Sequence, residues 1–248
     1  MSADMLKKDK KTVLVTGGNR GLGLAIVKSL SDAGYFVIAA ARSCSSELTQ
    51  VMENQDDVVF EPLDLSQFSD IHQWAKKIIS GYGAPYALIN NAALAHDGVL
   101  GTMHESQIFE IINVNVTGTI LLTKYISRSM LRARCGRIIN ISSIIASTGF
   151  NGLSVYAASK AALNGFTKSL SRELGKINIT VNAVAPGYME TNMSAGINDK
   201  QLDQIRNRSA LKRLAETSEV ASAVKYLLSD DASAITGTVL TIDAGNTA

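Results

Sequence analysis

The chain has 248 residues, of which 46% are hydrophobic and 19% charged, and its formal net charge is +2. This composition is typical of a globular protein with a sizeable core and excludes a disordered chain. The near-neutral charge provides no global field that would attract nucleic acid. The apolar run Phe36–Ala41 is far shorter than the roughly 18 to 20 residues that cross a bilayer, so we expect no membrane span.

The N-terminal residues and the cysteines indicate the cellular location of the protein. The first eleven residues, MSADMLKKDKK, have no apolar stretch that could form the core of a signal peptide. We therefore predict a flexible arm over residues 1–11 and no secretion. Cys44 and Cys135 lie far apart and have no metal-ligand spacing, which predicts reduced thiols, no metal site and a cytoplasmic location.

From Thr12 onward, short β-branched runs alternate with segments of helical period, the pattern of βαβ units around a parallel sheet. We predict strands at Thr12–Thr16, Phe36–Ala40, Val58–Pro62, Ala87–Asn90, Arg137–Ser142, Asn178–Val184 and Val239–Ile242. We predict helices at Gly21–Ala33, Phe68–Gly81, Glu105–Ala133, Val155–Gly175 and Ser218–Ser229. The sequence thus predicts an α/β fold, a single doubly wound Rossmann-type domain over residues 12–248 whose seven-stranded parallel sheet has helices on both faces. The polar stretch 188–209 predicts a lid.

A glycine-rich turn, Thr16–Gly23, follows the first predicted strand and precedes a helix. Glycines allow the backbone to turn sharply and approach a pyrophosphate, while the free N–H groups of the next helix attract the anion. The spacing Gly-x3-Gly-x-Gly differs from the commonest dinucleotide fingerprint but permits the same mechanism. The alternative is a βα turn without a ligand. The candidate cofactor residues here are Gly17, Gly18, Asn19, Arg20, Gly21, Leu22 and Gly23.

The second predicted strand is followed by Arg42, at the place where NAD sites usually have an acidic residue. A cation there suits the 2′-phosphate of NADP, and Arg20 in the glycine turn could face the same group. The alternative for Arg42 is a solvated surface side chain. We therefore predict NADP(H) as the cofactor.

Four polar residues form a candidate catalytic set. Tyr156 and Lys160 are four positions apart in a predicted helix, so they share one face. Ser143 follows a predicted strand at the carboxyl edge, where doubly wound sheets bind ligands. Asn115 lies inside a predicted helix although Asn is a poor helix former.

With these residues the sequence resembles the short-chain dehydrogenase/reductase family from about Lys11 to the C-terminus. The resemblance is carried by the Thr16–Gly23 turn, Asp64, Asn90-Asn91-Ala92, Asn115, Ser143, Tyr156-x3-Lys160 and Pro186-Gly187 with Thr191. Stretches such as GRIINISS and YAASKAALNGFTKSLSREL are most similar to the bacterial 3-oxoacyl-[acyl-carrier-protein] reductases within that family.

The resemblance implies a role for each residue of the set. Tyr156 would be the acid in reduction and the base in oxidation, and we expect a nearby ammonium and a nicotinamide cation to lower its pKa. Lys160 would also hold the nicotinamide ribose, Ser143 would hydrogen-bond the substrate carbonyl, and the Asn115 backbone would anchor a proton-relaying water. The resemblance also implies further cofactor contacts, which are Asp64, Leu65, Asn91, Ala92, Ala93, Pro186, Gly187, Met189 and Thr191. The alternative for Asp64 is a turn residue. Ala93 stands where the family more usually has Gly. His96 and Met193 are expected to contact substrate.

The implied function is NADPH-dependent reduction of a 3-oxoacyl thioester, linked to acyl-carrier protein or coenzyme A, in fatty-acid or polyketide synthesis. Two alternatives remain: reduction of a free ketone such as a sugar, steroid or cyclic alcohol precursor, and a non-catalytic nucleotide-binding regulatory protein. Basic residues could receive an acidic carrier protein or form a solvated face; they are Arg128, Arg132, Arg134, Arg137, Lys168, Arg172 and Lys176. The family resemblance also implies a homotetramer that pairs the helices at Glu105–Ala133 and Val155–Gly175.

Overall fold

The computed structural model describes residues 10–189 and 199–248 of the chain. Within them, a seven-stranded sheet has the strand order β3-β2-β1-β4-β5-β6-β7, and each neighbouring pair is parallel. The strands are β1 (Thr12–Thr16), β2 (Phe36–Ala41), β3 (Val58–Pro62), β4 (Ala87–Asn90), β5 (Gly136–Ile141), β6 (Ile179–Pro186) and β7 (Val239–Ile242). The predicted Rossmann-type sheet is confirmed, with strand ends that differ from the prediction by up to two residues.

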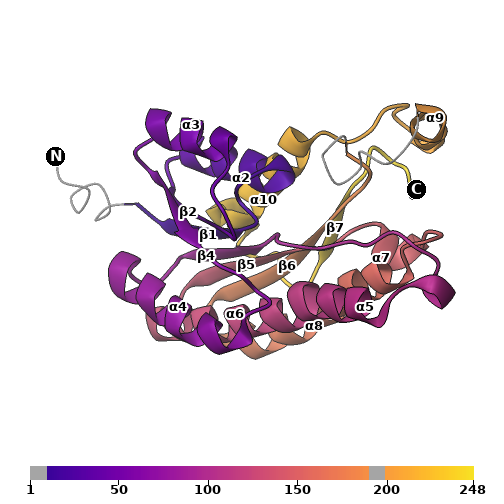
Figure 1. Ribbon diagram of the computed structural model, residues 1–248. Coiled ribbons are helices and arrows are strands. Elements are labelled where there is room, and N and C mark those ends of the chain that lie inside the picture. The colour runs from indigo at the N-terminus through magenta and orange to yellow at the C-terminus, as the bar shows by residue number, and fades with distance from the viewer. Residues whose placement is uncertain (1–9, 190–198) are drawn as a thin grey trace.

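Helices cover both faces of the sheet (Figure 1). One face carries α2 (Gly21–Asp32), α3 (Ser46–Asn54) and α10 (Thr217–Leu228), and the other carries α4 (Phe68–Tyr82), α6 (Thr119–Ala133) and α8 (Ser154–Leu174). The remaining α-helices and π-helix of the described residues are α5 (Glu105–Ile112), η2 (Asn113–Gly118, the π-helix), α7 (Ile145–Thr148) and α9 (Asp199–Arg208). No described helix is long and apolar enough to cross a membrane.

Two hydrophobic cores result, because successive strand residues point to opposite faces. Val13 and Val15 of β1 belong to the α2/α10 core, whereas Leu14 between them belongs to the α6/α8 core. All three side chains are fully buried. This explains why the strands are apolar on both faces, as the sequence indicated.

The predicted helix Glu105–Ala133 is interrupted in the structure. It consists of α5, η2 and α6 in succession, and the π-helical η2 contains Asn115. A π-helix is rare and often marks a functional position. The presence of Asn115, a poor helix former, inside the predicted helix is therefore explained, because the backbone there departs from α-helical geometry.

Three α-helices in the described part of the chain were not predicted. α3 begins after Ser45, whose hydroxyl accepts a hydrogen bond from the Leu48 N–H at 3.1 Å. The serine cluster at residues 43–46 therefore contains a helix N-cap. α7 has only four residues. α9 lies in the segment predicted as a lid; residues 190–198 of that segment lie outside the described residues.

Candidate active site

The four candidate catalytic residues converge beyond the carboxyl end of β5. Ser143 follows the end of β5, and its hydroxyl lies near enough to the phenol of Tyr156, in the first turn of α8, to act on the pKa of that phenol. The Lys160 Nζ lies 5.6 Å from the centre of the Tyr156 ring. Asn115 joins the cluster because its Nδ2 donates to the Ser159 Oγ at 3.0 Å. The four residues that the sequence analysis selected therefore lie together in one cluster.

Lys160 is almost fully enclosed, with a relative exposure of 2%. Its Nζ donates a hydrogen bond to the Ile141 carbonyl at 2.7 Å. No carboxylate among the described residues forms an ion pair with it, and burial lowers the pKa of Lys160 to about 8. The ammonium group can consequently lose its proton near neutral pH.

Burial raises the pKa of Tyr156 to about 12, the Ser143 hydrogen bond acts in the opposite direction, and the nearby Tyr188 phenol raises it further. In the protein alone the pKa of Tyr156 is thus raised, whereas the expected lowering also depended on a nicotinamide cation and stays a prediction for the complex. The physical reason is that Lys160 directs its Nζ to the Ile141 carbonyl, so desolvation of the phenol dominates. A phenol that stays protonated at neutral pH is suited to donate a proton.

Asn115 has a second role that its sequence position did not indicate. Its Oδ1 accepts from the Leu94 N–H at 2.7 Å, and its Nδ2 donates to the Leu94 carbonyl at 2.8 Å. The side chain thus fixes the backbone that follows β4. Ser159 continues this connection, because its hydroxyl donates to the Tyr156 carbonyl at 2.7 Å. Because the amide of Asn115 both accepts from and donates to the Leu94 backbone, it holds η2 at a fixed distance from the segment that follows β4.

The glycine turn forms a narrow cradle between β1 and α2. Gly17 has a φ of +64°, and a Cβ on Gly23 would lie 1.9 Å from the Gly17 carbonyl oxygen. Asn91 supports the turn from β4, since its Nδ2 donates to the carbonyls of Thr16 (2.9 Å) and Gly17 (3.2 Å). The sequence placed Asn91 at the cofactor site but did not reveal that it holds the turn.

The first turn of α2 retains N–H groups that can bind an anion. The N-cap residue, Arg20, makes no side-chain capping hydrogen bond, and the first turn contains no acidic residue. The free N–H groups and the positive end of the helix dipole suit a phosphate. The cradle and this helix end together fit the pyrophosphate of a dinucleotide.

Two exposed cations flank the cradle. Arg20 and Arg42 are both exposed, and neither forms an ion pair within residues 10–189 and 199–248. The Asn19 Nδ2 donates to the Ser43 carbonyl at 3.0 Å, which ties the glycine turn to the segment that carries Arg42. Both guanidinium groups thus remain available to an anionic group on the cofactor.

The other predicted cofactor residues have structural contacts of their own. The Asp64 carboxylate accepts from the Ser66 N–H and hydroxyl at 2.9 and 2.8 Å, as its alternative interpretation as a turn residue requires. Leu65 lies under η2, where a Cβ on Gly118 would come within 2.2 Å of the Leu65 carbonyl. The Ala92 N–H donates to the Thr16 Oγ1 at 3.0 Å, and Ala93 is partly buried beside it.

On the far side of the site, the end of β6 is fixed to the loop after β5. The Pro186 carbonyl accepts from the Ile144 N–H at 3.0 Å, and the Gly187 N–H donates to the Ile242 carbonyl at 2.9 Å. Met189 packs against the α2/α10 core. Thr191 and Met193 lie outside the described residues.

The loops that follow β4 and β5 meet near the catalytic cluster. His96 pairs with Glu110 of α5 at 2.9 Å, and the Gly98 N–H donates to the Gly152 carbonyl at 3.0 Å. His96 therefore has a carboxylate partner, which the sequence did not predict.

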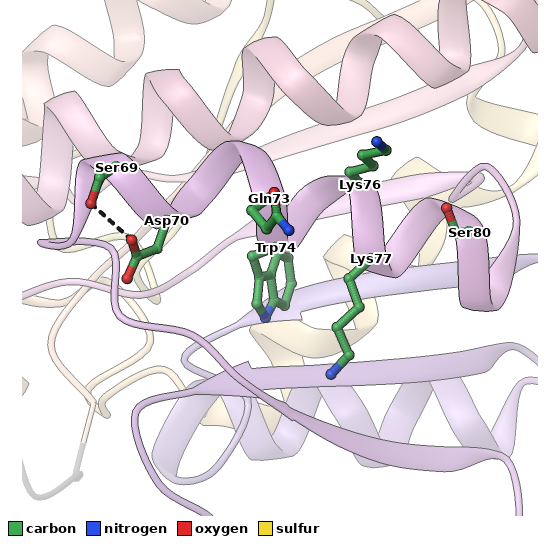
Figure 2. Close-up of a pocket in the computed structure, with 7 residues that line it drawn as sticks. All are labelled: Ser69, Asp70, Gln73, Trp74, Lys76, Lys77 and Ser80. Carbon is green, nitrogen blue, oxygen red and sulfur yellow. Dashed lines mark hydrogen bonds between the residues drawn. The ribbon is translucent and has the colours of Figure 1, made fainter.

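A separate hollow of about 770 Å³ lies along α4 (Figure 2). It is lined by Ser69, Asp70, Gln73, Trp74, Lys76, Lys77 and Ser80. None of these is a candidate catalytic or cofactor residue, and Lys77 is engaged with Glu61 at 2.6 Å. The cluster around Tyr156 and this hollow are therefore formed by different residues.

Comparison with known proteins gives matches over almost the whole chain. Residues 17–247 match the family model described as enoyl-(acyl carrier protein) reductase. The 3-oxoacyl-[acyl-carrier-protein] reductase FabG of Haemophilus influenzae is 39% identical over 235 residues, which cover 95% of this chain and 97% of that protein. The protein of the same name from Pseudomonas aeruginosa is 36% identical over 238 residues, with coverage of 95% and 96%. Nodulation protein G of Rhizobium sp. is 36% identical over 241 residues, with coverage of 97% and 98%.

The close packing of the cradle predicts that one methyl group added at Gly23 lowers stability and weakens dinucleotide binding. Gly23→Ala places a Cβ against the Gly17 carbonyl, and such overpacking costs about 1 to 3 kcal/mol. We expect a lower melting temperature and dinucleotide binding weakened by at least about tenfold, measured by fluorescence titration. Gly165→Ala in α8, where nothing lies within 4 Å of the added Cβ, is the control and should bind as the parent does. If Gly23→Ala bound the dinucleotide as tightly as the parent does, the cradle could not be its binding site.

The buried lysine predicts a pH-dependent stability. Because the folded pKa of Lys160 is lowered from 10.5 to about 8, the unfolded chain binds more protons between these values and the parent gains stability as pH rises through them. Lys160→Met lacks this gain, so its stability relative to the parent should fall by about 2 kcal/mol between pH 7 and pH 9.5 in urea unfolding. Lys168→Met, at an exposed position, should keep a constant difference. A pH-independent difference for Lys160→Met would disprove the assignment.

Proposed function

We propose that this chain, which belongs to the short-chain dehydrogenase/reductase family, reduces a 3-oxoacyl thioester to the 3-hydroxyacyl thioester with NADPH as hydride donor. The observation that carries the proposal is that Ser143 and the buried Tyr156, whose pKa of about 12 keeps the phenol protonated, lie beyond the end of β5, at the same edge of the parallel sheet as the glycine cradle that follows β1. The substrate class is supported by the near full-length similarity to two reductases named for 3-oxoacyl-[acyl-carrier-protein].

The chain's own residues would divide the reaction between them. When bound, NADPH supplies the hydride that reduces the carbonyl carbon. Ser143 donates a hydrogen bond to the carbonyl oxygen and stabilises the negative charge that develops there. Tyr156 transfers its phenolic proton to that oxygen, and burial keeps the phenol protonated until then. Lys160, with a pKa of about 8, is suited to return a proton to the tyrosine.

The cofactor would be NADP(H) rather than NAD(H). Arg20 and Arg42 are exposed cations without an acidic partner among the described residues, and they flank the cradle that suits the pyrophosphate. A 2′-phosphate would accept charge-assisted hydrogen bonds from both guanidinium groups, whereas a 2′-hydroxyl would leave them unused.

The thioester would be carried by an acidic carrier protein or by coenzyme A. Lys168, Arg172 and Lys176 are exposed along α8 and its C-terminal turn. They suit an acidic partner, although a solvated helix face would have the same composition. Arg137 does not belong to this surface, because its side chain is 4% exposed; the prediction that included it in a basic stripe is wrong.

The protein would act as a homotetramer. Phe109 on α5 and Ile120 and Leu131 on α6 are exposed apolar side chains, with relative exposures of 61%, 37% and 41%. They lie on the segments that the resemblance pairs between subunits, and a partner subunit would remove them from water.

Cofactor preference gives the first test of the proposal. Arg42→Asp removes a charge-assisted contact and adds repulsion, so the ratio of kcat/KM with NADPH to that with NADH should fall by about tenfold to a hundredfold. Lys225→Asp, at an exposed position on α10, changes the charge equally and should leave the ratio unchanged. Equal kcat/KM for both cofactors in the parent would contradict the assignment.

The chemistry gives the second test. Tyr156→Phe should lower kcat by about a thousandfold while NADPH affinity persists, because the phenol acts mainly in the transition state. Ser143→Ala should lower kcat by about a hundredfold to a thousandfold. Tyr226→Phe, at a position 46% exposed, is the control. The assay is NADPH oxidation with acetoacetyl thioesters, free 3-keto esters and cyclic ketones.

Each outcome of that assay decides between the alternatives. Preference for the thioesters supports the proposal. Faster turnover of free ketones would replace the proposed substrate by a sugar, steroid or cyclic ketone. No turnover of any carbonyl compound would leave a nucleotide-binding protein without catalysis.

A further inference from the structure

A chain of four buried polar side chains crosses the α6/α8 core. Thr123 of α6, Asn90 of β4, Asn140 of β5 and Thr167 of α8 are each 3% exposed or less. The Asn90 Nδ2 donates to the Thr123 Oγ1 at 2.9 Å and to the Asn140 Oδ1 at 2.8 Å. The Asn140 Nδ2 then donates to the Thr167 Oγ1 at 2.8 Å. We call these four residues the polar bridge.

The polar bridge links two helices through two neighbouring strands. Asn90 and Asn140 are directly paired in the sheet, and the residues two before them, Leu88 and Ile138, belong to the α6/α8 core. Both amides therefore point to the face that carries α6 and α8. The Thr123 hydroxyl also donates to the Thr119 carbonyl at 2.7 Å, which continues the hydrogen bonds into the helix backbone.

Stability alone gives a poor reason for this arrangement. The Asn90 Oδ1 is buried without a hydrogen-bond partner among the described residues, and such an acceptor carries an uncompensated desolvation cost. Apolar side chains of similar shape would avoid that cost. Apolar contacts are non-directional, however, so they allow a helix to slide along the sheet, whereas hydrogen bonds of fixed length do not. The polar bridge thus determines where α6 and α8 lie along their axes.

Both helices carry groups of the candidate active site. Thr167 lies seven residues, about two turns, after Lys160, so the two side chains share a face of α8. Lys160 must reach the Ile141 carbonyl at 2.7 Å, and Ile141 is the residue next to Asn140. A small shift of α8 along its axis would break that contact. On the other helix, α6 continues directly from η2, which holds Asn115.

We propose that the polar bridge positions the active site, with Thr167 as the positioning residue that sets the place of Lys160 and Tyr156 relative to the end of β5. The inference rests on the proposed reductase function, because the effect of misplacement is read in catalysis. Thr123 has the equivalent task for η2 and Asn115 at the other end of the polar bridge. The hydrogen bond between Asn115 and Ser159 joins the two positioned helices at the site itself.

The decisive variants change one hydroxyl. Thr167→Val keeps the shape of the side chain and removes the acceptor for Asn140, and Thr167→Ser restores it. Thr180→Val is the matched control: Thr180 is also a buried threonine, 5% exposed, but its hydroxyl has no hydrogen-bond partner in the described part of the chain. We expect kcat to fall about tenfold in Thr167→Val with NADPH affinity within about twofold of the parent, since small displacements of catalytic groups reduce rate more than binding. Thr167→Ser should recover most of kcat, and Thr180→Val should keep it.

Hydrogen exchange provides a readout that does not depend on turnover. Amides of residues 113–118 and 154–160 should exchange faster in Thr167→Val than in the parent and in Thr180→Val, while amides of β1 and β2 remain as protected as before. If Thr167→Val fails to fold, Thr123→Val answers the same question through η2, with the same control.

The outcomes separate this inference from the function on which it rests. A kcat in Thr167→Val equal to that of Thr180→Val, or no recovery in Thr167→Ser, overturns the inference even when the parent is an active reductase. Uniformly faster exchange across the sheet also overturns it, because that result indicates general destabilisation. If the parent reduces no carbonyl compound but the exchange changes are confined to residues 113–118 and 154–160, the proposed function fails and the positioning role stands.

Discussion

The buried ammonium group of Lys160 is the interaction on which the catalytic half of the structure depends. An ammonium in the core is costly unless a hydrogen-bond acceptor meets it, and the Ile141 carbonyl does so at 2.7 Å. This contact requires that β5 ends there and that α8 passes close to its end. Desolvation then lowers the pKa of Lys160 to about 8, so the same burial that constrains the fold suits the group to the proton transfer that we propose for it.

The two faces of the sheet have different tasks. On the α2/α10 side, the absence of a side chain at Gly23 allows α2 to approach the β1 turn and presents N–H groups to an anion. On the α6/α8 side, Gly118 allows η2 to lie against Leu65, and polar side chains hydrogen-bond the helices that carry the candidate catalytic groups. The carboxyl edge of the sheet joins both sides, as it does at the ligand sites of doubly wound folds.

The sequence was sufficient for the sheet and for most of the longer helices. Strands such as Ala87–Asn90 are short β-branched or apolar runs whose burial on both faces leaves a local signal. α3 was missed because it has only nine residues and its N-terminus lies in a serine-rich stretch that resembles a loop. η2 was missed because a helix with one wider turn keeps nearly the same apolar period as an uninterrupted one.

The sequence by itself also determined which residues form the candidate site, because the spacing of Tyr156 and Lys160 and the place of Ser143 after a strand are local properties. Only the tertiary structure decided what surrounds them. The pKa of Tyr156 is raised because the folded chain excludes water from the phenol and directs Lys160 to a backbone carbonyl. Asn115 contacts Leu94 across 21 positions of sequence. Burial and long-range hydrogen bonds arise only when distant segments pack together, so no local pattern records them.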